Sequence, residues 1–517
     1  MTDDSNDSSG SAPLPPAEDV QPAPLSPEES PVVRRLNKVL TRIKRMVPGY
    51  RNRELKNQAA HVVAFHRGKM DEEDNRESTP PVDEKVSLHC LWAMEFFPPS
   101  RRPALIEGLR SLGWDNPGDG LGSGSPVTWV QDMRDHFGAR GWFGLGLIAR
   151  PGDKRFLMQP RRAWLPGGVD FAFASIHHVL PSVTAVVMQF ILDEKDSSTY
   201  EDSLRRVYAT DVRPHSGRWL TILDPAARKR EAIAATRLAL RRRCQGFFRT
   251  HLPGAFSLQD GQDEFPTCEF ISTAQARPFT DSLESGFHSY GALLGITRTF
   301  DVWRCDKFPA LRLAWRTFEK GKERHLILAA NETELLEQEK DFQPKGAIGR
   351  AFVSRQLDLD LWLVRWGLSE LVSLYADRLA TLRDRSFQAL SLTRTSRTLD
   401  RTQEELMQLR PDVLSIVHDL ETMERYGGLA RGREYKFMPV DEKWGGKKEL
   451  VEDLSESLSR GAHSVRQALA DVTENLTVGS NILSTKGNLA LQRAVTWMTL
   501  VILLLTAFLV YSEFRPK

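Results

Sequence analysis

The sequence feature that most constrains this chain is an uncharged, apolar run near its carboxyl end. Residues 495–511 have the sequence VTWMTLVILLLTAFLVY, which contains no charge, proline or glycine. A helix needs about 17 residues or more to cross the hydrocarbon layer of a bilayer. We therefore predict one membrane-spanning helix over 494–512, followed by a short tail, 513–517; the alternative is a buried core helix. The residues assigned to the span are Val495, Trp497, Leu500, Leu504, Phe508 and Tyr511.

The amino-terminal sequence favours one orientation of such a span. Residues 1–31 contain seven acidic residues, seven prolines and neither Lys nor Arg, which is the reverse of a basic-then-apolar secretion signal. We expect the residues ahead of the span to stay in the cytoplasm, so that the chain is a single-pass protein of the membrane (the inner or plasma membrane in a bacterium). The charges beside the span are too balanced to decide its orientation.

Overall composition excludes several classes of protein. The 70 basic and 68 acidic residues leave a formal charge of +2, so we expect no nucleic acid among the partners. Four scattered cysteines are too few for a disulfide-stapled secreted domain or a four-thiolate zinc site. The remaining composition is that of a globular protein with a buried core.

Two unlike segments precede the globular part of the chain. Residues 1–30 have the acidic, proline-rich composition of a disordered tail. Residues 31–48 predict a basic amphipathic helix, with an apolar stripe from Val33 to Val47, before a charged linker over 49–85. Such a helix fits an anionic bilayer surface, or else its stripe packs on protein. The basic residues proposed for membrane contact are Arg34, Arg35, Lys38, Arg42, Lys44 and Arg45.

Residues 86–350 mix strand and helix patterns. Alternating or continuous apolar runs predict strands over 86–97, 169–179 and 183–192, the last of them in the middle of a sheet because it is apolar on both faces. Asp224-Pro225 predicts the start of a long helix that ends near Thr250. We therefore expect an α+β or α/β domain.

Heptad patterns dominate the chain after this domain. Apolar residues at heptad spacing predict a long, coiled-coil-like helix over 359–426, with a kink at Pro411. A Gly-rich loop over 427–447 separates it from a second long helix over 448–493. We expect these helices to form an antiparallel hairpin, in which they pair with each other or with copies of themselves in a homo-oligomer.

The search for chemistry identifies no catalytic residues, cofactor site or metal site. His177 and His178 are adjacent on an expected strand, so they would point to opposite faces, one toward the core and one toward solvent. Asp358 and Asp360 lie where a helix begins and would serve as N-terminal charges. The basic residues of the helix after Asp224 are expected to form a solvated face or to face acidic neighbours. The catalytic residues therefore stay unknown.

The order of parts in this chain resembles that of the CorA-type divalent-cation channels, which also place a mixed α/β domain and long helices before the membrane. Those channels have two spans joined by a Gly-Met-Asn signature, and this sequence contains no Gly-Met-Asn. Three functions stay open: a membrane-tethered interaction or scaffolding protein, which we favour; a transport component; and a membrane-bound enzyme whose site is not recognisable. The lipid bilayer is the one partner expected in all three.

Overall fold

The computed structural model describes thirteen stretches of the chain, beginning at residue 69. They are 69–115, 125–135, 141–156, 161–215, 219–257, 265–280, 289–297, 302–314, 324–338, 359–391, 396–425, 436–440 and 448–513. The chain forms two compact units. Among the described residues, one unit contains the two-stranded sheet of β6 (Asp211–His215) and β7 (Trp219–Leu223) as far as Ile222, and the other contains the remainder.

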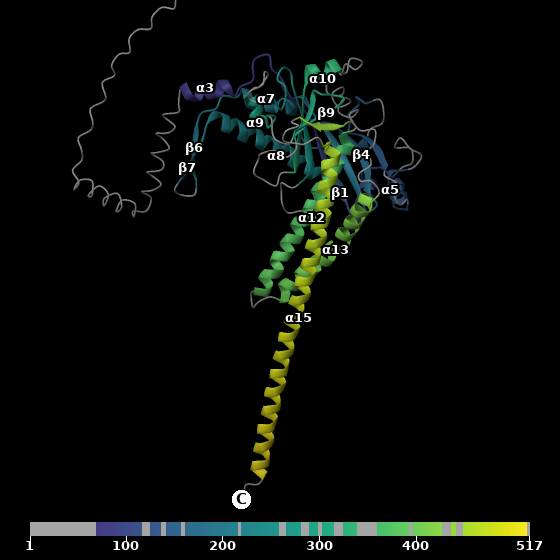
Figure 1. The fold of residues 1–517 in the computed structure, drawn as a ribbon, viewed down its shortest axis with the longest axis vertical. Coiled ribbons are helices and arrows are strands. Elements are labelled where there is room, and N and C mark those ends of the chain that lie inside the picture. The colour runs from purple at the N-terminus through teal and green to yellow at the C-terminus, as the bar shows by residue number, and fades with distance from the viewer. Residues whose placement is uncertain are drawn as a thin grey trace, which may run out of the picture. The chain divides into compact units, whose positions relative to one another are not determined.

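A ten-stranded mixed sheet forms the centre of the larger unit, in the order β12-β9-β10-β11-β8-β1-β5-β4-β2-β3 (Figure 1). Most neighbours are antiparallel, whereas β11 with β8 and β2 with β3 are parallel. The α+β class is therefore confirmed. The strands are β1 (Val86–Phe97), β2 (Gly141–Ala149), β3 (Arg161–Arg162), β4 (Val169–Leu180), β5 (Val183–Leu192), β8 (Thr267–Thr273), β9 (Val302–Cys305), β10 (Leu311–Ala314), β11 (His325–Asn331) and β12 (Phe437–Pro439).

Helices cover both faces of this sheet. On one face, the rings of Phe247 and Phe248 in α8 (Pro225–His251) pack edge-on against Phe190 of β5. On the other face, α12 (Leu359–Ser391) brings Gly367 so close to Phe96 of β1 that a Cβ there would lie 2.7 Å from the ring. The predicted strands and the long helix after Asp224 are confirmed, and β5 lies between β1 and β4 as expected.

Because both faces are covered, the expectation for the histidine pair was half wrong. His177 and His178 in β4 do occupy opposite faces: His177 contacts Ser175, and Arg102 lies near His178. Both are buried, however, and neither faces solvent. Burial, with Arg102 nearby, lowers the pKa of His178 to about 4. Adjacent strand residues separate into core and solvent positions only in a sheet with one open face.

The remaining helices are short, and α3 and α9 pack against α8. Among them, α3 is held at its carboxyl end by Lys229 of α8, whose ammonium donates to the carbonyl of Asn75 and the hydroxyl of Thr79. A cation is favourable there because the last carbonyls of a helix carry partial negative charge. These helices are α3 (Lys69–Glu77), η1 (Pro99–Arg101), α4 (Arg102–Ser111), α5 (Pro126–Asp135), α6 (Glu194–Ser197), α7 (Thr199–Arg205), α9 (Tyr290–Leu294) and α10 (Glu332–Gln338).

Among the described residues, three helices and not two form the bundle that follows the sheet (Figure 1). The single helix expected over 359–426 is instead two: α12 and α13 (Ser396–Arg425), which pack against each other. Both also pack against α15 (Leu450–Glu513), one continuous helix of 64 residues. Pro411 lies inside α13, and the helix continues through it. Heptad spacing predicts an apolar stripe, but it does not reveal how many helices share that stripe.

Two buried aspartates fasten α13 to the sheet domain. The carboxylate of Asp412 accepts hydrogen bonds from the backbone N–H and the hydroxyl of Ser100, at 2.9 and 2.6 Å. Two turns further, Asp419 accepts the backbone N–H of Ser182 in the β4–β5 turn, at 2.7 Å. Hydrogen bonds to a buried carboxylate are strong and directional, so these contacts fix the bundle against the sheet.

Candidate functional site: the bundle and the exposed end of α15

The first half of α15 is the central helix of the bundle. An apolar stripe at heptad spacing, which includes Leu454, Leu458, Val465, Val472 and Leu476, is buried against its neighbours. Gly461 allows a close approach to α12, since a Cβ there would lie 2.8 Å from Cγ1 of Val372. The stripe that the sequence predicts is therefore used within the chain.

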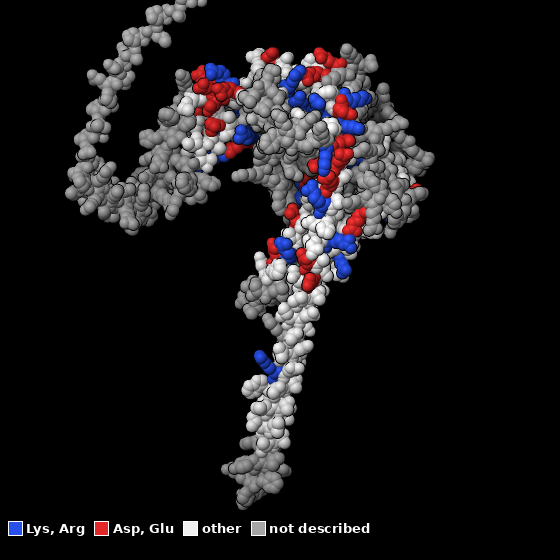
Figure 2. Space-filling model, in the orientation of Figure 1, with Lys and Arg blue, Asp and Glu red and all other residues white. Residues whose placement is uncertain are grey.

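The second half of α15 leaves the bundle. From Ser480 onward, every residue whose side chain is described is exposed. Four of the residues assigned to the span, Val495, Trp497, Leu500 and Leu504, are between 47% and 69% exposed. Phe508 and Tyr511 lie in the same helix, but their side chains are outside the described residues. Figure 2 shows that this length of α15 carries almost no charge.

An exposed helix of this composition is suited to lipid and not to water. Soluble proteins rarely expose contiguous apolar surfaces of this extent. Among the residues that the structure describes, one helix is long and apolar enough to cross a membrane, and its most apolar 18-residue window has no buried part. A helix also satisfies its own backbone hydrogen bonds, as a lipid environment requires.

The other membrane candidate is not placed by the structure. Arg34, Arg35, Lys38, Arg42, Lys44 and Arg45 lie outside the described residues. The membrane-surface interpretation of 31–48 stays a prediction.

Comparisons with known proteins do not indicate a function for this chain. No protein-family model, curated protein or solved structure matches the chain. The polar clusters of the domain are therefore judged by their own geometry.

One cluster contains the residue types of a hydrolase triad. The hydroxyl of Ser175 in β4 lies 2.9 Å from Nε2 of His177 and 2.7 Å from Oδ2 of Asp360 in the first turn of α12. A catalytic triad needs the histidine between serine and carboxylate, so that it can accept the serine proton. Here the serine lies between the histidine and the carboxylate, and its hydroxyl donates a hydrogen bond to Asp360. The cluster therefore joins α12 to the sheet and lacks an activated nucleophile.

A second cluster contains a basic residue of α8, a helix whose basic residues were expected to form a solvated face or to face acidic neighbours. Arg237 does the second: it donates to both carboxylate oxygens of the fully buried Glu269, at 2.7 to 3.1 Å, and to the carbonyl of Leu294. Tyr200 donates to the same carboxylate at 2.7 Å. Burial opposes the charge of Glu269, but Arg237 lowers its pKa to about 2. Sequence could not identify this pair, because Glu269 lies in a strand 32 residues away.

A third polar cluster surrounds the buried carboxylate of Glu95. Its oxygens accept the backbone N–H groups of Phe96, Phe256 and Ser257, at 2.8 to 3.0 Å, and the hydroxyl of Ser257. Burial raises the pKa of Glu95 to about 7, although the hydrogen bond from Ser257 acts in the opposite direction. Because Phe256 and Ser257 lie after α8 and Glu95 lies in β1, these hydrogen bonds hold the segment after α8 against β1.

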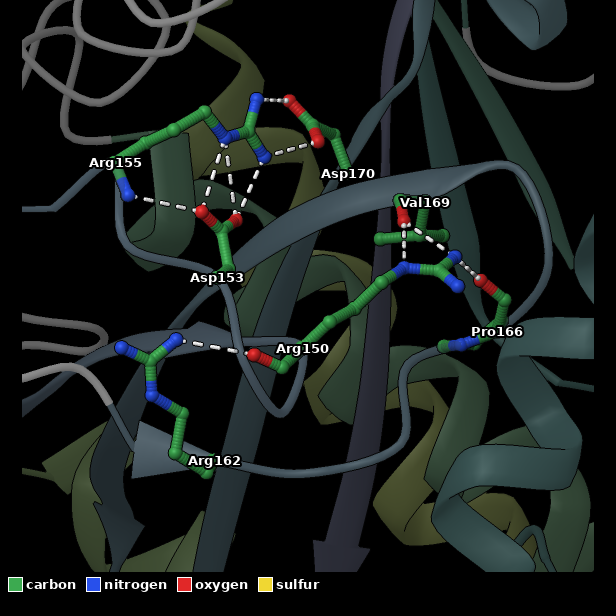
Figure 3. A network of polar contacts seen from close by, with 7 residues as sticks. All are labelled: Arg150, Asp153, Arg155, Arg162, Pro166, Val169 and Asp170. Atoms are coloured by element: carbon green, nitrogen blue, oxygen red, sulfur yellow. Dashed lines mark hydrogen bonds and ion pairs between the residues drawn. The ribbon is translucent and has the colours of Figure 1, made fainter.

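An arginine network lies between the end of β2 and the start of β4, and the bonds drawn in Figure 3 all join residues of this region. Arg155 donates to the carboxylates of Asp153 and Asp170 at 2.5 to 3.2 Å, and it lowers the pKa of Asp153 to about 2. Arg150 donates to the carbonyls of Val169 and Pro166, and Arg162 to that of Arg150. These bonds tie the segment after β2 to the start of β4.

Metal chemistry has no support in the described part of the chain. No group of three or more His, Cys, Asp or Glu there is arranged to hold an ion. The four cysteines are buried and unpaired by disulfides. The helical bundle with its exposed apolar extension is thus the feature with the clearest functional consequence.

Proposed function

We propose that this protein is a membrane-tethered interaction or scaffolding protein, with its α+β domain in the cytoplasm. The observation that carries the proposal is the continuity of α15, which is buried in the bundle at one end and exposes an uncharged apolar surface at the other. Because one continuous helix connects the bundle to the apolar end, the length of that helix sets the distance between the domain and the bilayer.

Truncation after Leu491 tests the anchor. The bundle keeps all of its buried α15 residues, which end at Gly479, so the truncated protein is expected to fold and to remain in the soluble fraction. The full chain should stay with membranes after a high-salt or alkaline wash. A matched control replaces Leu500 and Leu504 by Arg in the full chain, since each buried arginine costs about 2.5–3.5 kcal/mol of insertion free energy. Membrane retention of the truncated form would contradict the proposal.

A transport component is the second candidate. What favours it is the same direct helical connection between the domain and the membrane. One helix per chain cannot enclose a pore, so this candidate requires several copies around a common axis. A monomer by light scattering in detergent would remove it and leave the scaffolding function. The enzyme alternative has weaker support, because the triad-like cluster around Ser175 has the wrong order of contacts.

A further inference from the structure

A short segment directly after α8, residues 252–257, packs against the last residues of β1. Five of its six residues are buried. The backbone N–H of Ala255 donates to the carbonyl of Phe96 at 2.9 Å. The ring of Phe256 packs edge-on against that of Phe96, with their centroids 6.1 Å apart. The segment is therefore part of the packed interior.

Helix α12 contacts the same segment. Arg378 of α12 donates to the carbonyl of Ala255 at 3.2 Å. Arg324, which directly precedes β11, lies over the ring of Phe256 at 5.4 Å and donates to Glu370 of α12 at 3.0 Å. The segment thus links β1 to α12.

These contacts lie where α12 passes from the sheet to the bundle. Gly367 of α12 packs closely on Phe96 of β1, and little more than one turn later Val372 packs on Gly461 of α15. We call residues 252–257, with their contacts to β1 and α12, the joint, because α12 continues from here into the bundle that contains α15.

Glu95 supplies the carboxylate at the centre of the joint. Its oxygens accept the backbone N–H groups of Phe256 and Ser257 and the hydroxyl of Ser257. Gly254 lies so close to the Glu95 side chain that a Cβ has no room there. Hydrogen bonds from N–H groups favour the ionised carboxylate, whereas burial opposes it. Burial has the larger effect and raises the pKa of Glu95 to about 7.

Several charged or titratable groups lie on the elements around the joint. Arg249 donates to the carbonyl of Ser257, and Arg324 forms ion pairs with Glu370 and Asp377. In the described part of the chain, none of these groups forms an ion pair with Glu95, so hydrogen bonds alone stabilise its ionised form in the closed joint. The groups are Arg241, Arg249 and His251 of α8, Arg324 before β11, and Glu370, Asp377 and Arg378 of α12.

We propose that the joint is a pH-sensitive connection between the sheet domain and the bundle, closed while Glu95 is protonated and opened to water more often once Glu95 is ionised. The inference deepens the scaffolding function proposed above, because an open joint lets the domain change its orientation relative to the anchoring helix. The joint itself does not depend on insertion of α15 into a membrane.

The direction of the effect follows from proton binding. The closed joint binds the proton of Glu95 with a pKa of about 7, and the open joint, in which water reaches the carboxylate, binds it with the ordinary pKa of 4.5. A group whose pKa is raised in the closed state stabilises that state at low pH and loses this effect as the pH rises. The open fraction should therefore increase about ten-fold between pH 6 and pH 8, and then level off because Glu95 is ionised in both states.

Hydrogen exchange of the full chain in detergent micelles measures the opening. Protection factors of Ala255, Phe256 and Ser257 are compared at pH 6, 7, 8 and 9, because a protection factor excludes the direct effect of pH on the exchange chemistry. They are expected to fall about ten-fold from pH 6 to pH 8 and to change little from pH 8 to pH 9. The amide of Ser182, which donates to Asp419 outside the joint, is the internal control and should not follow this change.

Two variants separate the titration from the packing. Glu95→Gln removes the titrating group, so the pH dependence of the protection factors should disappear. Arg378→Met keeps Glu95 but removes the hydrogen bond from α12 to Ala255. Protection of the joint should then fall at every pH, while the ratio between pH 6 and pH 8 stays about ten-fold.

Protection that does not vary with pH in the wild type would overturn the inference, and so would a pH dependence that persists in Glu95→Gln. A change of equal size at Ser182 would also contradict it, because the effect would then be a loss of overall stability. Unchanged protection in Arg378→Met would show that α12 does not hold the segment. The measurement in detergent does not test the anchor, which sedimentation of the full chain with membranes tests separately.

Discussion

At the residue scale, the interior of this protein contains ionisable groups whose partners come from distant parts of the chain. Glu269, Glu95 and Asp412 are all buried, and each accepts several hydrogen bonds. Removal of one member of such a group costs far more than the group contributes in net stability, because it leaves a buried partner unsatisfied. These residues therefore specify how the segments fit together.

Glu95 should make stability fall as the pH rises. Its pKa is about 7 in the folded protein and 4.5 in its ordinary state, so between these values the folded state binds the proton more tightly. Stability from this group is complete below pH 4.5 and is lost as the pH rises toward 7, by about 3 kcal/mol at 1.36 kcal/mol per unit. Urea unfolding of the wild type and Glu95→Gln at pH 5 and 8 measures the difference. A pH-independent difference between the two would contradict the assignment.

At the element scale, α15 contains two glycines in opposite environments. Gly461 faces α12 at a distance that leaves no room for a Cβ, whereas at Gly487 nothing beyond the adjacent residues and the backbone of its own helix lies within 4 Å of the Cβ position. Both lie in the interior of the same helix, where Ala is favoured over Gly by about 0.8–1 kcal/mol. The structure thus provides a matched pair in which packing alone differs.

Gly461→Ala is expected to lower the free energy of unfolding by about 1–3 kcal/mol, because the added methyl group must displace Val372. Gly487→Ala should be neutral or should slightly increase helicity. Thermal unfolding followed by circular dichroism, in detergent and on both variants, measures the two effects. Equal stability of the two variants would mean that α12 and α15 do not approach as closely as the structure places them.

At the scale of the whole molecule, we predict that the basic segment 31–48 makes a second contact with the membrane that holds the proposed anchor. We expect a peptide of residues 28–50 to become helical with anionic vesicles and much less so with neutral ones, because its basic residues each gain about 1 kcal/mol near an anionic surface. Binding should weaken as salt is raised. Circular dichroism with both vesicle types measures this, and equal helicity without vesicles would favour packing on protein instead.

The sequence by itself determined the features that depend on local pattern. The strand at 183–192 follows from its apolar run and is β5, and the helix start at Asp224 follows from capping and begins α8. The uncharged run at 495–511 follows from its length and composition and lies in the exposed end of α15. These signals are strong because hydrophobic burial and backbone geometry act within a few residues. The start at Asp224 has a direct cause, since its carboxylate accepts the N–H of Ala227.

Only the tertiary structure decided which surfaces meet. Both faces of the sheet are covered, so His177 and His178 are both buried, and α8 turns Arg237 inward to Glu269. Within 359–425, α12 and α13 are separate helices, which pack against each other as well as against α15. A stripe of apolar residues predicts that a helix packs against a partner. The number of partner helices and their orientation depend on long-range packing, which a local sequence pattern does not specify.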